Sequence, residues 1–121
     1  MTASGDAARL RNNAGVPSVP SGLVHQGQIG AIVAQAAQRL GPEVVHVAYS
    51  IGQDSTGEPS IFFRILLSDS SIREETITDV TSRIGTVLFD AVRPLEHWGL
   101  RPYFNFRSKS EQDQRRDPDW A

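Results

Sequence analysis

The most informative stretch of this chain is Trp98-Gly99-Leu100-Arg101-Pro102-Tyr103-Phe104-Asn105-Phe106-Arg107. Successive side chains of a strand point to opposite faces, so Leu100, Phe104 and Phe106 share one side. The other side receives Arg101, Tyr103, Asn105 and Arg107. This pattern predicts a strand that contributes to a core on one face and displays polar and aromatic groups on the other.

Two earlier runs alternate in the same way. Residues 44–51 place Val45, Val47, Tyr49 and Ile51 on one face and His46, Ala48 and Ser50 on the other. Residues 61–68 place Ile61, Phe63, Ile65 and Leu67 opposite Phe62, Arg64 and Leu66. The turn-forming residues 52–59 lie between them, which predicts an antiparallel hairpin with a projecting loop.

Two segments have helical periodicity. Apolar residues recur at helical spacing from Ile29 to Leu40 and again from Ile77 to Leu95. Ser71 and Glu74 have the spacing of a capping box, which predicts that the second helix begins there, and Arg93-Pro94 predicts where it ends.

The resulting order, α-β-β-α-β, predicts an α+β two-layer sandwich in which two helices cover one face of a three-stranded sheet. The covered face is expected to be the one that carries Val45, Val47, Ile65 and Phe104. The third strand can lie beside the first or the second.

The chain divides into three parts by composition. Residues 1–24 are rich in Ala, Gly, Ser, Asn and Pro and predict a flexible leader. Residues 25–108 form the single domain, and residues 109–121 form a charged tail. Within the tail, residues 110–113 are expected to start one more helical turn, and Trp120 to hold the tail against the domain.

The second face of the sheet has no helix to cover it. Phe62, Leu66 and Tyr103 together would expose more apolar surface than a soluble monomer usually shows. The expected cover is a second copy of the chain, the tail or leader, or another partner or ligand. The residues expected to bind are Phe62, Arg64, Leu66, Arg101, Tyr103, Asn105 and Arg107, with Asp54, Thr56 and Glu58 in the adjoining loop.

Two of these arginines raise the question of anion binding. Arg64 and Arg107 share a face if their strands are neighbours, and two guanidinium groups can grip a carboxylate or phosphate. The alternative is that they pair with acidic residues such as Glu111 or Asp113, or with groups across a dimer seam.

The composition excludes several classes of site. The 121 residues carry 12 basic and 14 acidic side chains, so no broad basic surface for nucleic acid is expected. The absence of cysteine excludes disulfides, thiolate metal ligands and cysteine nucleophiles. It also fits a reducing compartment, and with no membrane span or signal sequence we expect a cytoplasmic protein.

No motif for metal, cofactor or catalysis is found. His25, His46 and His97 lack metal-ligand spacing. The loop acids do not match a calcium loop and fit a turn in which Asp54 accepts backbone N–H bonds. The sequence therefore predicts no metal and no cofactor, and leaves an enzymatic role uncertain.

The order of elements resembles the type II KH arrangement of RNA-binding and ribosome-associated proteins. That family carries a Gly-x-x-Gly turn between two helices, which binds the RNA backbone. In this chain the pattern occurs only at Gly27-Gln28-Ile29-Gly30, before the first expected helix, so we assign no family.

The leading hypothesis is a small protein-interaction module, as a homodimer or with another protein, in the manner of small bacterial antitoxins and complex subunits. Nucleic-acid or nucleotide binding through Tyr103 and the arginines is the second hypothesis. A small enzyme with His46 and an arginine in a pocket is the third.

Overall fold

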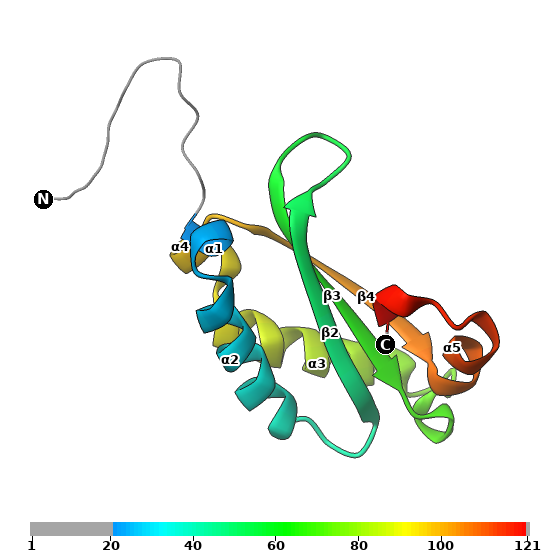
Figure 1. Cartoon of the computed structure of the whole chain (residues 1–121). Coiled ribbons are helices and arrows are strands. Elements are labelled where there is room, and N and C mark those ends of the chain that lie inside the picture. Colours follow the sequence, from blue (N-terminus) through cyan, green and yellow to red (C-terminus); the bar gives the residue numbers. More distant parts are fainter. Residues whose placement is uncertain (1–20, 121) are drawn as a thin grey trace, which may run out of the picture.

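The computed structural model describes residues 21–120 (Figure 1). The first twenty residues of the expected leader lie outside this range. The helices are α1 (Ser21–Val24), α2 (Gln26–Gln38), α3 (Ile77–Val92), α4 (Pro94–Trp98) and α5 (Lys109–Arg115), with short 3-10 turns η2 (Asp69–Ser71) and η3 (Pro118–Trp120). The strands are β2 (Val44–Gln53), β3 (Pro59–Leu67) and β4 (Arg101–Ser108).

The sheet has the order β2-β3-β4. The β2–β3 hairpin is antiparallel, with Tyr49 opposite Phe63. β4 runs parallel to β3 and places Phe104 opposite that same phenylalanine. The third strand therefore lies beside the second, and α3 and α4 form the crossover that a parallel pair requires.

The helices and the sheet form two layers around one core, which confirms the predicted α+β class. Figure 1 shows α2 and α3 on one side of the sheet and the C-terminal segment on the other. The buried residues of the core come from α2 and the turn after it, from β3 and α3, and from the residue before β4: Ile29, Val33, Ala36, Leu40, Ile61, Phe63, Ile65, Leu67, Ile84, Leu88, Val92 and Leu100. No helix within residues 21–120 has the length and apolar character needed to cross a membrane.

One predicted core residue is on the wrong side. The β2–β3 register shifts between Val44 and His46, and this bulge inserts one extra residue into β2. Val45 is consequently 46% exposed, whereas Val44 packs against the core. Alternation resumes after the bulge, so Val47 and Tyr49 occupy the predicted face.

The predicted start of the long helix is also wrong. Ser71 ends the turn η2, and its hydroxyl donates to the carbonyl of Ser68 at 2.7 Å instead of capping a helix. α3 begins at Ile77. The predicted end is confirmed, because Arg93 adopts a left-handed conformation (φ 48°) immediately after Val92. Leu95 then falls in α4 and is exposed instead of continuing the apolar stripe.

The two ends of the described chain are more ordered than a leader and a tail. Residues 21–24 form α1, which contacts α4. The predicted helical turn in the tail is present as α5, and Trp120 is buried, so the expectation that it holds the tail in place is confirmed. The Gly27–Gly30 pattern lies within α2 and makes no turn.

Candidate recognition surface

The face of the sheet away from the helices, the open sheet face, contains every strand residue predicted for it. Phe62 lies opposite Tyr103, Arg64 opposite Asn105, and Leu66 opposite Arg107. On β2, Ser50 lies opposite Phe62 and Ala48 opposite Arg64. The period-two pattern thus predicted the correct set because no bulge interrupts β3 or β4 along these pairs.

The centre of this face is an aromatic pair. The rings of Phe62 and Tyr103 stack with centroids 5.4 Å apart and planes 13° apart. The Tyr103 hydroxyl donates to Asp54 Oδ2 at 2.7 Å. The phenol is therefore fixed at both its face and its hydroxyl, so this pair needs little further ordering to act as a contact surface.

Asp54 holds the β2–β3 loop to β4. Its Oδ1 accepts from the backbone N–H groups of Thr56 (2.8 Å) and Glu58 (3.0 Å) and from the Thr56 hydroxyl (2.6 Å). These bonds confirm the predicted turn, and the Asp54 side chain is only 5% exposed. Arg101 adds a longer ion pair at 3.8 Å.

The same contacts shift two protonation equilibria. Hydrogen bonds from Thr56 and Tyr103 stabilise the carboxylate and hold the pKa of Asp54 well below its usual range. Conversely, the bond to Asp54 raises the pKa of Tyr103, because an ionised phenol could no longer donate it. The aromatic pair and its anchor therefore keep one charge state across the physiological range.

The tail covers the other end of the open sheet face. Arg107 donates to Gln112 Oε1 at 2.8 Å, lies 3.6 Å from Asp117 Oδ2, and stacks its guanidinium over the Trp120 ring at 4.2 Å. The Arg107 side chain is only 12% exposed as a result. Leu66, in the same cross-strand pair, is also buried.

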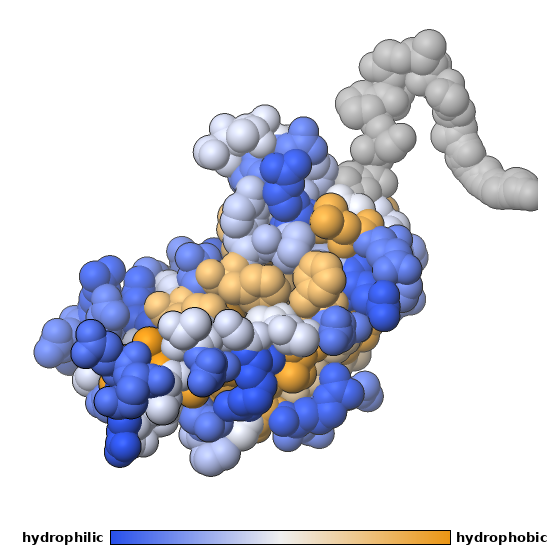
Figure 2. Space-filling view, turned by 180° about the vertical axis from the view of Figure 1, so that it is seen from behind, coloured by the Kyte–Doolittle hydropathy of each residue, from blue (hydrophilic) through white to orange (hydrophobic). Residues whose placement is uncertain are grey.

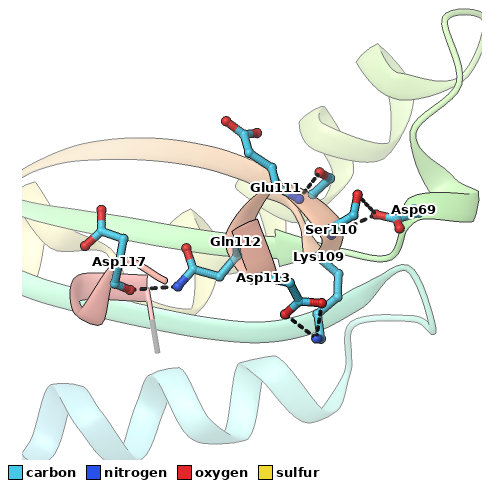
Figure 3. A network of polar contacts seen from close by, with 8 residues as sticks. Asp69, Lys109, Ser110, Glu111, Gln112, Asp113 and Asp117 are labelled. Atoms are coloured by element: carbon cyan, nitrogen blue, oxygen red, sulfur yellow. Dashed lines mark hydrogen bonds and ion pairs between the residues drawn. The ribbon is translucent and has the colours of Figure 1, made fainter. Parts of the chain in front are cut away.

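The tail is itself held by a polar network (Figure 3). Gln112 Nε2 donates to the carbonyl of Asp117 at 2.7 Å, which closes the segment between α5 and η3. Asp69 accepts from both the backbone N–H and the hydroxyl of Ser110 at 3.1 Å, which ties α5 to the turn after β3. Figure 3 shows these residues converging from three separate segments.

The acidic partner of Arg107 is not one of those predicted. Glu111 pairs with Arg115 at 2.9 Å, and Asp113 pairs with Lys109 at 2.7 Å, each within α5. Arg107 instead forms an ion pair with Asp117 and a hydrogen bond with Gln112. Arg64 and Arg107 thus lie on neighbouring strands, but the tail occupies Arg107 and they do not form an open anion site.

Arg64 is the exception among the arginines of the sheet. Within residues 21–120, its guanidinium has no hydrogen bond and no ion pair, although the residue is half-buried. Its cross-strand neighbours are Ala48 and Asn105. We call the part of the open sheet face that the tail leaves uncovered the recognition patch; it consists of Ser50, Phe62, Arg64, Tyr103 and Asn105.

Two features of this surface were not predicted from the sequence. The Asp54–Tyr103 bond joins residues 49 positions apart, and the contact between Arg107 and Gln112 depends on how the tail folds back.

The described residues include no group of three or more histidine or acidic side chains able to hold a metal ion. His46 is exposed on β2.

Comparison with known proteins identifies no relative. No family model matches the chain, and neither the curated proteins nor the solved structures include a significant match.

Proposed function

We propose that this protein is a protein-interaction module that binds another protein through the recognition patch. The observation that supports this most directly is a prearranged aromatic stack beside an arginine that has no partner within the described chain. Aromatic residues and arginine carry much of the binding energy in protein interfaces, and rigid anchors lose little entropy on binding.

The chemistry of the patch indicates what its partner carries. A guanidinium binds carboxylates through paired N–H donors, and Asn105 opposite Arg64 supplies further donors and an acceptor. The partner should therefore present an acidic side chain next to an apolar one, which covers the stacked rings of Phe62 and Tyr103.

A different protein fits this patch better than a second copy does. The strand residues of the open sheet face include three arginines in addition to the aromatic groups, and no carboxylate. Arg101 and Arg107 already have partners, so Arg64 is the arginine that needs one, and a second copy of the same face offers it no carboxylate, which disfavours the symmetric pairing.

The other two hypotheses find less support. Nucleic-acid binding would need an aromatic ring free to stack on bases and arginines free to bind phosphates. One face of the Tyr103 ring already stacks on Phe62, and the Arg107 guanidinium already stacks on Trp120 of the tail. An enzyme would need His46 in a pocket with an arginine, and His46 is exposed on the strand. Location in the cytoplasm remains a prediction from the absence of cysteine.

The test uses one charge reversal and a matched control. Arg64→Glu changes the patch, whereas Arg73→Glu makes the same change in net charge at an exposed position before α3. A photoreactive amino acid in place of Ser50 is used to crosslink bound partners in the cells in which the protein is made. The captured partner is then purified, and its binding to the wild type and to each variant is measured by calorimetry.

We expect Arg64→Glu to weaken that binding by about tenfold or more and Arg73→Glu to leave it within about twofold. Equal binding by both variants would refute the proposal. Capture that is abolished by nuclease treatment would indicate nucleic-acid binding instead.

A further inference from the structure

The two edges of the sheet differ. β2 forms one edge and carries the bulge at Val44–His46, a device that makes an edge a poor template for another strand. β4 forms the other edge and pairs with β3 without interruption from Arg101 to Ser108. Its outer side therefore presents a regular row of backbone donors and acceptors, with Pro102 as the only residue lacking an N–H.

An apolar groove of about 440 Å³ runs beside this edge, between α3 and β4. Its lining is entirely uncharged: Thr81, Ser82, Gly85, Thr86 and Phe89 from α3, and Phe104 and Phe106 from β4. Phe89 is 42% exposed. Figure 2 shows the corresponding side of the molecule, where an apolar band lies between polar regions.

We propose that a second copy of this chain occupies this edge, with the two β4 strands antiparallel and centred on Asn105. The sheet then has six strands, and the two grooves close against each other across the two-fold axis. Tyr103 and Asn105 belong to both surfaces, because β4 carries part of the recognition patch and also forms this edge. The second copy, however, would bind the backbone edge of β4 and the groove on the helix side of the sheet, so the proposal goes beyond the function proposed above.

The sequence of β4 favours this register. Centred on Asn105, the pairing sets Phe104 opposite Phe106 of the second copy and Tyr103 opposite Arg107 of the second copy. Aromatic pairs across antiparallel strands stabilise a sheet. A register centred on Phe104 would instead oppose Arg101 and Arg107 within the paired strands, where like charges are destabilising. In the register centred on Asn105, Arg101 faces Lys109, which lies beyond the end of β4 in α5.

The symmetry of the contact is the reason to choose a second copy. A two-fold interface must be complementary to itself, and a strand that matches its own reverse meets this condition. The groove is also compatible with two-fold symmetry, because its lining has no charged side chain that would be brought near the same side chain of the second copy. The recognition patch would not meet this condition, because a second copy of the same face brings no carboxylate to Arg64.

A glycine in the groove allows a direct test. A Cβ atom at Gly85 would meet no other atom within 4 Å, so a larger residue there leaves the protomer intact and improves its helix propensity. Gly85→Arg should nevertheless obstruct a second copy. Gly27→Arg is the matched control, because its Cβ also meets nothing and it lies in α2, outside the groove.

Sedimentation velocity of the full chain measures the result. We expect the wild type and Gly27→Arg to sediment as a species of twice the 13.3 kDa chain mass, and Gly85→Arg as a monomer. Phe89→Glu should also be monomeric, whereas Leu95→Glu, at another exposed apolar position, should remain a dimer. A monomeric wild type, or a dimer unaffected by Gly85→Arg, would overturn the proposal.

The register has its own measurement. The chain contains no cysteine, so Asn105→Cys introduces a single thiol on the proposed two-fold axis. Mild oxidation should link this variant into a covalent dimer, while Ser50→Cys on β2 should remain unlinked. Linking of Ser50→Cys without Asn105→Cys would place the second copy on the open sheet face and overturn the edge-to-edge arrangement.

Discussion

Replacing Trp120 by alanine should release the tail without unfolding the domain. Burying an indole of about 150–250 Å² contributes about 4–6 kcal/mol at about 25 cal/mol per Å². Its stacking with Arg107 adds about 1 kcal/mol. Against this, ordering the four residues Asp117–Trp120 costs about 4–8 kcal/mol at about 1–2 kcal/mol per residue. The docked segment is thus held by a small net free energy.

The consequence is a limited loss of stability. Once Trp120→Ala tips the balance, the tail undocks and recovers its chain entropy, so the free energy of unfolding should fall by about 1–2 kcal/mol. A tryptophan in a rigid core costs about 3–5 kcal/mol when truncated, because the surrounding chain cannot relax. Urea unfolding followed by far-ultraviolet circular dichroism measures the difference.

Hydrogen exchange locates the effect. Amides of α5 should lose protection in Trp120→Ala, while those of β3 retain it. Leu95→Ala, an exposed apolar truncation away from both the tail and the groove, serves as the control. A loss of 3 kcal/mol or more, or unchanged protection in α5, would refute the reasoning that the tail is an independently docked segment.

Three further outcomes are expected. Asp54→Asn should lower the thermal midpoint at pH 7. The pKa of Asp54 is lower in the folded than in the unfolded chain, so the ionised carboxylate stabilises the fold at any pH above its unfolded pKa of about 4. As the pH falls below about 4 this contribution is lost, and the difference in midpoint between wild type and variant should narrow. Melting curves from pH 2 to 7 test this, and a constant difference would contradict it. Gly85→Ala should raise the free energy of unfolding by about 0.5–1 kcal/mol in urea, whereas Gly22→Ala should lower it, because a Cβ there would overlap the side chain of Leu100; equal effects of the two substitutions would disprove the packing argument. Phe63→Ala should cost about 3–5 kcal/mol, since the ring is fully buried, and a cost below 1 kcal/mol would mean that the core can collapse around it.

The sequence predicted the faces of the sheet better than the ends of its elements. Alternation placed Phe62, Arg64 and Tyr103 together because a strand has no freedom to send neighbouring side chains the same way. Val45 broke the rule because a bulge depends on the fit between two strands and leaves no mark in the alternation itself.

Helix boundaries depended on local bonds that compete with one another. Ser71 had the spacing for a helix cap, but its hydroxyl bonded backward to Ser68 and closed a 3-10 turn instead. α3 ended at Arg93, as the following proline predicted. A second helix, α4, begins directly after it, and the apolar stripe running on to Leu95 did not distinguish these two helices from one. The anchor between Asp54 and Tyr103 joins two distant segments, so it follows from the tertiary fold alone.

The parallel pairing of β3 with β4 also sets an order for folding. The β2–β3 hairpin joins neighbouring segments and can close early, but β4 reaches its place only after α3 and α4 have been made and have crossed the sheet. Until then one edge of β3 is bare, with Phe63 and Ile65 lacking the aromatic cover of Phe104 and Phe106. The ribosome synthesises β4 after the β2–β3 hairpin. The species most prone to aggregate during synthesis is therefore the hairpin whose β3 edge β4 has not yet covered.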